Sequence, residues 1–329
     1  MTNTFWRRVF FLMAALAAFA ARADGTLPAA APEPGQDTLA ADVPKPPVSY
    51  TGAGISAVVP GGGQVYHGRY IMGGAFLTAE AGAAGFSIYW WGESGRRGRE
   101  TARLRDETSR LRDSAALIDE HGGAAVDTAA LLYRAGLYSV LADKSEFEAR
   151  QAKYTAYNAL AWAVGIHLYS FMDALELDGF TARGEAKDPT RAGLLAAVPF
   201  LGLGQLYNAR PGKAGMMAMT QVSLMVTALN HNRLMNAASD KYNEMRDSTS
   251  AQYAYRADHL SYWKSRYDSA FSRRNTYLWV SLFAYLYSIF DAVVDAHLSD
   301  YEEKIRVNPD LSTGVDGGYR ASLAVTVEF

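Results

Sequence analysis

The sequence predicts an all-α fold: a duplicated helical membrane protein with about four transmembrane helices, two Pro/Gly-broken bends, polar helical inserts and a short C-terminal β-strand. Three observations predict it. A glycine-rich motif occurs twice with the same internal spacing. An apolar segment of helix length follows each copy. Each half then closes with the pattern Tyr-Ser-x-x-Asp-Ala. Two matched signatures in the same order predict an internal duplication.

The two copies of the motif predict two bends. The first copy comprises Gly61, Gly63, Gln64, Tyr66, Arg69 and Gly74, and the second comprises Gly202, Gly204, Gln205, Tyr207, Arg210 and Gly215; a proline precedes each copy, Pro60 and Pro199. Proline and glycine interrupt helices, and a break at membrane depth leaves backbone groups without partners. Because a glutamine side chain both donates and accepts hydrogen bonds, Gln64 and Gln205 are predicted to satisfy these groups. We favour a structural bend, re-entrant or interfacial; the alternative is a frame for a pore or a small-molecule site.

The N-terminus is predicted to be a targeting segment. Arg7 and Arg8 precede an apolar run over residues 9–20 and an Ala-x-Ala site that ends at Ala23. This order predicts a signal peptide over residues 1–23, cleaved after Ala23, with an uncleaved anchor as the alternative. Residues 24–50 are rich in proline and alanine and are expected to form a disordered tether.

The rest of the chain divides into two repeats and a tail. The first membrane repeat is predicted over residues 54–177 with a polar helical insert at 92–153, the second over 192–298 with an insert at 230–276, and the tail over 299–329. Apolar spans are expected at 70–91, 154–177, 214–229 and 277–292. In the first repeat, a short helix is expected up to Val59 and a long one from about Tyr70. In the first insert, Leu104, Thr108, Leu111, Ala115 and Ile118 form a heptad-like seam.

Two carboxylates stand out because they occupy the same place in both halves. Asp173 and Asp291 each come late in an apolar helix. Intramembrane carboxylates are costly and are usually paired. Arg69 and Arg210 are the predicted partners, and solvation at a helix end is the alternative.

The C-terminal tail alternates between apolar and polar residues from Tyr319 to Phe329. This period of two predicts a β-strand. A strand that ends in phenylalanine resembles the last strand of an outer-membrane barrel, but a single strand cannot close a barrel that needs at least about eight. We therefore expect it to pair with another chain or to pack on the surface.

These residues resemble a known family. The resemblance lies in Pro60–Arg69, Pro199–Gly215 and Asp291–Leu298. They are similar to an uncharacterised bacterial membrane protein family, a domain of unknown function with the signature PGxGQxYNxxxxKG, and more distantly to the two-transmembrane-helix domain family. The first copy departs from the signature at His67 and Met72, whereas the second keeps Asn208 and Lys213. The resemblance implies membrane embedding and no known activity.

Composition and motifs argue against several functions. The chain has no cysteine and a net charge of −2, which removes thiolate chemistry and gives no electrostatic basis for nucleic-acid binding. Its six histidines show no metal-ligand spacing, and no phosphate-binding loop or nucleophile elbow is present. We therefore expect no catalytic residues, no cofactor and no metal, and the chain is not expected to be an enzyme.

The expected function is that of a non-enzymatic scaffold or interaction protein of the bacterial cell envelope. Its expected partners are the lipid bilayer and either another envelope protein or further copies of itself. The inner membrane is favoured, with both inserts cytoplasmic, because Arg96, Arg97 and Arg99 follow the first span. One alternative is a small channel or transporter that uses Glu80, His167, Asp173, Gln221 and Asp291, although a lone histidine such as His167 is more often a packed core residue. The other is an outer-membrane-associated helical protein anchored through its C-terminal strand.

Overall fold

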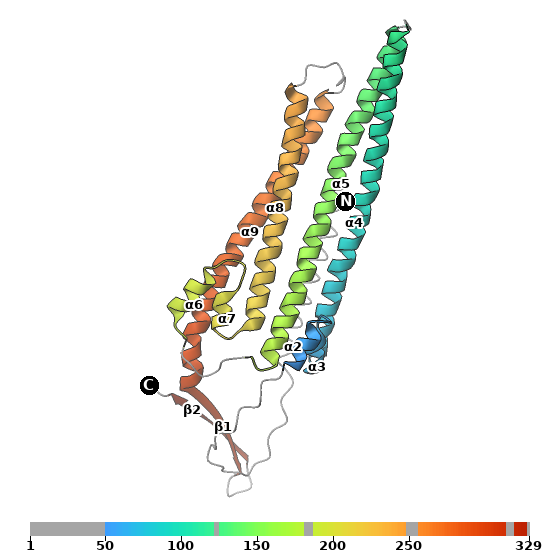
Figure 1. The fold of residues 1–329 in the computed structure, drawn as a ribbon. Helices are drawn as coiled ribbons and strands as arrows, with labels where there is room; N and C mark the ends of the chain where they lie inside the picture. The colour runs from blue at the N-terminus through green and yellow to red at the C-terminus, as the bar shows by residue number, and fades with distance from the viewer. Residues whose placement is uncertain (1–49, 122–124, 181–186, 248–255, 314–318, 328–329) are drawn as a thin grey trace. The chain divides into compact units, whose positions relative to one another are not determined.

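The same order of helices occurs twice in the computed structural model, which describes residues 50–121, 125–180, 187–247, 256–313 and 319–327. The first half contains α2 (Thr51–Ser56), α3 (Gly62–Tyr66), α4 (Tyr70–Glu120) and α5 (Ala125–Leu177), and the second α6 (Pro189–Ala196), α7 (Leu203–Tyr207), α8 (Pro211–Asp247) and α9 (Arg256–Lys304) (Figure 1). Each half thus has two short helices followed by two long ones. The predicted signal peptide with its cleavage site, the tether up to residue 49 and the terminal Phe329 lie outside the described residues.

The first bend differs from its expected form in one respect. The expected short helix is present as α2, and the long helix begins at Tyr70 as predicted. Between them, however, two of the three consecutive glycines at 61–63, Gly62 and Gly63, form part of a further short helix, α3. Glycine disfavours a helix by about 1 kcal/mol relative to alanine. One short turn can still form where tertiary hydrogen bonds hold it, as described below.

The polar inserts are continuations of the apolar helices. α4 runs without a break from the apolar segment at 70–91 into the polar insert, and α5 returns through it. Hydroxyl groups on α4 connect the two helices: Ser87 Oγ donates to the carbonyl of Ala156, and Ser94 Oγ donates to the carbonyl of Ala149, each at 3.0 Å. Thr108, Leu111 and Ala115 of the predicted seam are buried.

The chain folds into two compact units that do not coincide with the sequence repeats. The motif unit comprises the described residues up to Glu80, Gly165–Gln221 and those from Ala284 on. The insert unit comprises Ala81–Val164 and Val222–Phe283. Each unit therefore contains residues from both halves of the chain.

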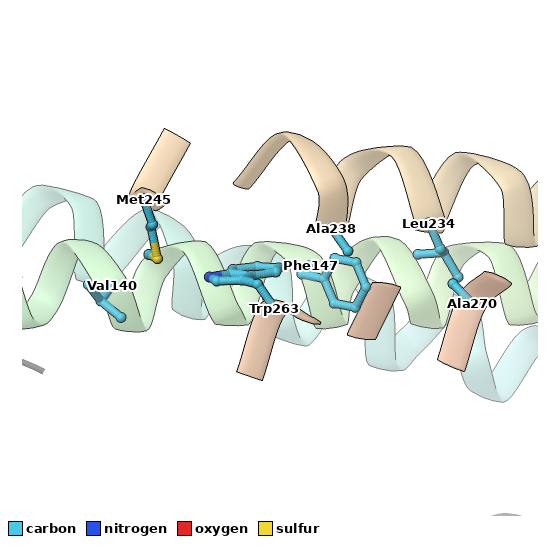
Figure 2. Close-up of a cluster of buried hydrophobic side chains, with 7 residues drawn as sticks. All are labelled: Val140, Phe147, Leu234, Ala238, Met245, Trp263 and Ala270. Carbon is cyan, nitrogen blue, oxygen red and sulfur yellow. The ribbon is translucent and has the colours of Figure 1, made fainter. Parts of the chain in front are cut away.

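The insert unit has a hydrophobic core built by α5, α8 and α9 (Figure 2). Its buried members are Val140, Phe147, Leu234, Ala238, Met245, Trp263 and Ala270. Phe147 and Trp263 meet edge to face, with ring centroids 5.3 Å apart and an interplanar angle of 88°. Polar contacts surround this core, including the ion pair of Lys241 with Asp143 at 3.1 Å. Around this core the unit has the apolar interior and charged surface typical of a helical bundle, whereas its apolar helix segments are exposed, for example at Ile88 and Phe283.

Within the described part of the chain, two helices are long and apolar enough to cross a membrane, judged by length and composition. They are α4 and the segment Asp258–Ser299 of α9. Only 17% of the residues in the apolar window of each helix are buried inside the structure. The other two predicted spans, at 154–177 and 214–229, lie within α5 and α8.

The tail contains two strands where the sequence predicts one. β1 (Ile305–Thr313) and β2 (Tyr319–Val327) pair antiparallel, with Ile305 opposite Val327 and Thr313 opposite Tyr319. The expected partner of β2, another chain or the protein surface, is thus replaced by a segment of the same chain. β1 was missed because its centre contains asparagine, proline and aspartate, which strands disfavour.

Candidate functional site

Gln64 is the centre of the first bend. It lies on α3, and its exposed fraction is 0%. Its Nε2 donates to the carbonyl oxygen of Ser170 at 2.9 Å and to Oδ2 of Asp173 at 2.8 Å, both on α5. Its Oε1 accepts hydrogen bonds from the hydroxyls of Ser56 and Ser170, each at 3.3 Å. The amide therefore ties α3 to both α2 and α5.

The same two serines also satisfy backbone groups of the glycine turn. The N–H of Gly61 donates to Ser170 Oγ at 2.7 Å, and the N–H of Gly63 donates to Ser56 Oγ at 2.8 Å. N–H groups at the start of a helix have no intrahelical partner. The first bend thus satisfies these groups with side chains from neighbouring helices instead of with water.

Gln205 repeats this arrangement in the second bend. It lies on α7 and is also fully buried. Its Nε2 donates to the carbonyl oxygen of Ser288 at 2.8 Å and contacts Oδ2 of Asp291 at 3.5 Å. Next to it, Nδ2 of Asn208 donates to the carbonyl of Ala292 at 2.7 Å. In both halves, therefore, the motif glutamine binds the serine and aspartate of the closing Tyr-Ser-x-x-Asp-Ala pattern.

Asp291 has a lysine partner instead of the predicted arginine. Nζ of Lys213 lies 3.2 Å from Asp291 Oδ1 and 2.6 Å from Asp295 Oδ2. Burial lowers the pKa of Lys213, but its hydrogen bonds and the charges of the two carboxylates outweigh burial and raise the pKa above its ordinary value. The first half has Met72 at the position of Lys213, so it cannot form this pair.

Arg69 and Arg210 contribute through their backbones. Their N–H groups donate to the carbonyl of the motif glutamine in each copy, at 2.7 and 2.9 Å. This bond closes a Schellman motif, in which the preceding residue adopts the left-handed conformation. That residue is Gly68 in the first copy and Ala209 in the second, with φ of 78° and 58°. The side chain of Arg210 lies 3.7 Å from Glu176, whereas the exposed Arg69 makes no ion pair with any described residue.

Asp178 is an important residue that the sequence did not reveal. Its carboxylate accepts hydrogen bonds from the N–H groups of Gly52 at 3.2 Å and Ala53 at 2.7 Å, and it contacts His67 Nε2 at 2.7 Å. It therefore caps α2 from a distant helix end. The second half uses a local cap, because Asp188 directly precedes α6. Only the local cap has a sequence signal, an aspartate followed by proline.

The remaining motif residues differ between the two copies. Tyr66 is exposed, whereas the hydroxyl of Tyr207 accepts a hydrogen bond from the N–H of Asp188 at 3.2 Å. Gly215 lies against α5, and Gly74 faces open space. Two glycines, Gly63 and Gly204, are buried, and Pro60 and Pro199 lie in the turns between the short helices.

A second polar connection holds the end of the first short helix in each half. His167 on α5 places Nδ1 3.1 Å from Glu80 of α4 and Nε2 3.2 Å from the carbonyl oxygen of Ala57, which follows α2. In the second half, the hydroxyl of Tyr285 donates to the carbonyl of Ala197, which follows α6, at 2.8 Å. The first short helix of each half is thus held at its C-terminal end by the second long helix of the same half.

Several contributing residues were not singled out by the sequence reasoning. They are Ser56, Ser170, Asp178, Ser288 and Asp295. The repeated closing pattern contains both Ser170 and Ser288, so the duplication itself was the signal that could have found them. Within the described residues, no group of three or more His, Asp or Glu side chains is placed to hold a metal ion. What this arrangement does chemically is to satisfy the polar groups of a broken helix.

The fold and the site define a class of protein: a duplicated all-α protein with two glutamine-centred bends and two long helices whose composition suits a membrane. Residues 185–329 match a family of unknown function, DUF5683. This region includes the second motif copy and α6 to α9. Neither a curated protein nor a solved structure matches the chain. The expected resemblance to a family of unknown function is confirmed over residues 185–329, and for residues 54–177 it stays a prediction.

Proposed function

We propose that this protein is a non-enzymatic scaffold of the bacterial cell envelope, held in the inner membrane by four helical segments of α4, α5, α8 and α9. The observation that carries the proposal is the burial of Gln64 and Gln205 within hydrogen-bonded bends. A chain that bends inside or beside a bilayer must satisfy its backbone polar groups internally. The first bend does so through serine side chains and Gln64, and the second through the side chains of Gln205 and Gln221.

The apolar exterior of the motif unit supports the same proposal. Ile71 and Leu77 of α4 are exposed, as are Tyr287, Phe290 and Val294 of α9. A soluble monomer rarely exposes contiguous apolar surface of this kind. A core helix of a soluble protein would be mostly buried, whereas only 17% of the residues in the apolar windows of α4 and α9 are buried. A membrane suits such faces, because lipid or a neighbouring helix within the bilayer covers them.

The insert unit supplies the scaffold surface in this proposal. Its core stabilises two helical hairpins, and ion pairs such as Arg97 with Glu148 and Arg105 with Glu146 connect α4 to α5. The mixed surface charge of this unit, with arginine and glutamate side chains paired between α4 and α5, favours contact with a protein partner. Crosslinking in cells followed by affinity capture tests this role: loss of the captured partner on deletion of the insert tips supports it, and a partner retained without the inserts contradicts it.

The embedding and the orientation are tested with single cysteines, because the natural chain has none. Ser109→Cys places a thiol on the exposed surface of the first insert, and Val58→Cys places one at the first bend, where Val58 is 80% exposed. With the outer membrane permeabilised, we expect an impermeant maleimide to label the Val58→Cys variant directly and the Ser109→Cys variant only after inner-membrane lysis. Immediate labelling of the Ser109→Cys variant would show that the insert is exported and would favour the outer-membrane alternative. Extraction of the protein by alkaline carbonate would contradict embedding.

A second candidate function is a small channel or transporter. Glu80 lies in the predicted first span and contacts His167, and ionisable residues inside a membrane mark ion or proton pathways by default. Purified protein in liposomes should then conduct ions or protons above background, and Glu80→Gln should reduce that flux. Flux equal to that of protein-free liposomes would rule out this candidate and leave the scaffold.

A further inference from the structure

The two halves of the chain meet at a close contact between α5 and α8 in the motif unit. A methyl group added to Gly215 would lie 2.8 Å from Cβ of Met172 and 3.1 Å from Cα of Tyr169. One added to Gly165 would lie 2.6 Å from Cγ of Met219. Small residues that let two helices approach closely are the usual basis of helix packing in membranes. The second long helix of the first half therefore packs on the first long helix of the second half.

The duplication implies a counterpart of this contact, between α9 and α4. By position in the repeated motifs, Gly215 corresponds to Gly74, Met172 to Phe290 and Tyr169 to Tyr287. The counterpart is not formed within the described chain. A methyl group added to Gly74 meets nothing within 4 Å, and Phe290 and Tyr287 are 67% and 58% exposed. A closed two-fold arrangement of the halves would have buried the surface of α4 at Gly74 and the surface of α9 at Tyr287 and Phe290.

The side chains on the two open faces are complementary in size. In the internal contact, a large residue on α8, Met219, fills the space at Gly165 of α5. At the corresponding positions the sizes are reversed: Thr78 is the small residue on α4, and Phe283 is the large one on α9. Phe290 likewise corresponds to Met172, which packs against Gly215, and Gly215 is the counterpart of Gly74. The open faces thus retain the pairing of large with small residues that close helix packing needs.

The open faces of α4 and α9 also carry apolar residues where the end of the α5–α8 contact carries a charged residue. In the internal contact, the N–H of Gly212 donates to Glu176 Oε2 at 2.9 Å. The corresponding residues are Ile71 and Val294, which are 60% and 51% exposed. Two exposed aliphatic residues thus stand where the internal contact has a hydrogen-bonded polar pair, and they can pack together without a backbone hydrogen bond.

We propose that α4 of one copy packs against α9 of a second copy by repeating the α5–α8 contact. The inference rests on the proposed membrane embedding, since it assumes that both copies lie in one bilayer. The contact is heterologous, because two different faces meet, so it generates a closed ring or an open chain of copies. The scaffold is therefore built from repeated halves, with the same helix contact alternating within and between chains.

Disulfide crosslinking in native membranes tests the proposal. Gly74→Cys together with Phe290→Cys should give dimers and a ladder of larger species on mild oxidation. Each single variant should give little dimer alone, and the two singles expressed together should give dimers without a ladder. The matched control is Met172→Cys with Gly215→Cys: a Cβ added at Gly215 would lie 2.8 Å from that of residue 172, so the two helices need to separate by only about 1 Å to reach the Cβ–Cβ distance of a disulfide. This pair should give an intrachain disulfide and no ladder.

Three results would overturn the proposal. The first is no intermolecular product from the Gly74→Cys/Phe290→Cys variant while the control disulfide forms. The second is an intrachain disulfide in that double variant, which would show that one chain closes on itself. The third is equally strong dimer formation by Gly74→Cys alone, which would indicate a symmetric α4–α4 contact. Because the control reports the fold and carbonate extraction reports embedding, failure of this contact is distinguishable from failure of the proposed function.

A variant that blocks the contact provides an independent readout. Gly74→Phe fills the open face of α4 and should abolish the ladder formed by Ile71→Cys with Val294→Cys. Gly54→Phe is the control, because Gly54 also faces open space but lies on α2, and it should leave the ladder intact. A ladder that persists in the Gly74→Phe variant contradicts the proposed interface.

Discussion

His167 lies between Glu80 and the backbone carbonyl of Ala57, with Nδ1 3.1 Å from the carboxylate and Nε2 3.2 Å from the carbonyl oxygen. Both neighbours of the histidine ring, the Glu80 carboxylate and the Ala57 carbonyl, are hydrogen-bond acceptors. The second half has Gln221 in place of Glu80 and Tyr285 in place of His167. There, the hydroxyl of Tyr285 donates a hydrogen bond to the corresponding carbonyl, that of Ala197, at 2.8 Å.

We therefore predict that His167→Ala destabilises the protein by about 1–3 kcal/mol, because it leaves the Ala57 carbonyl and Glu80 without a partner. Glu80→Gln should cost less, since an amide can donate to a neutral histidine. The double variant Glu80→Gln/His167→Tyr, which copies the second half, should recover part of the loss. Chemical unfolding in detergent measures these free energies. A Glu80→Gln cost as large as that of His167→Ala would contradict the proposed role of the pair.

The buried glutamine of the first bend should be among the most sensitive residues of the motif. Gln64→Leu removes hydrogen bonds to two serines and to Asp173, so buried polar groups are left unsatisfied. We expect a loss of about 3 kcal/mol or more in the free energy of unfolding. Tyr66→Phe is the control, because Tyr66 is exposed and the change should stay within about 0.5 kcal/mol. Thermal and denaturant unfolding of both variants measures the difference.

Two glycines with the same backbone conformation should respond differently to alanine. Gly61 and Gly68 have φ of 80° and 78°. An added Cβ at Gly61 would lie 2.1 Å from the carbonyl oxygen of Gly73, whereas one at Gly68 meets nothing within 4 Å. Gly68→Ala should therefore cost only the left-handed strain, about 1 kcal/mol, and Gly61→Ala considerably more. Ala209→Gly, the reciprocal change in the second copy, should stabilise the protein by about 1 kcal/mol. Equal losses at the two glycines would contradict the clash.

The lowered pKa of His231 in the insert unit should make the stability of the protein depend on pH. It stacks on Tyr277, with ring centroids 5.5 Å apart. Burial, and then the charge of Arg273, lower its pKa from 6.5 to about 4. A histidine with a depressed pKa in the folded state contributes stability that is present above pH 6.5 and is lost as the pH falls towards 4.

The loss should be about 1.4 kcal/mol per pH unit between these values. His231→Phe keeps an aromatic ring next to Tyr277 but cannot be protonated, so its stability should fall less steeply with acidification. The free energy of unfolding of both proteins is measured at several pH values, and the two slopes are compared. Other titrating groups contribute equally to both slopes and cancel in the difference. Parallel curves would show that His231 does not carry the effect.

Most central residues of the two bends could be predicted from the sequence, but the cation that pairs with Asp291 could not. Gln64, Gln205, Asp173 and Asp291 were singled out because they recur in matched patterns, and the structure brings each glutamine to the aspartate of its own half. The assignment of arginine as the partner of Asp291 differs from the structure, in which Lys213 takes that place. Pattern alone could not decide between these neighbouring cations, because the direction in which a side chain points depends on how the helix start is capped.

Features that depend on neighbouring residues could be predicted from the sequence alone. Proline and glycine mark the breaks, apolar runs mark the long helices, and repeated spacing marks the duplication, because each follows from local backbone sterics and side-chain periodicity. The tertiary structure decided which distant groups meet. Asp178 caps α2 across 125 residues, and Gly74 and Gly215, identical in motif position, have open and closed surroundings. Such contacts depend on the packing of whole helices against one another, which no local pattern encodes.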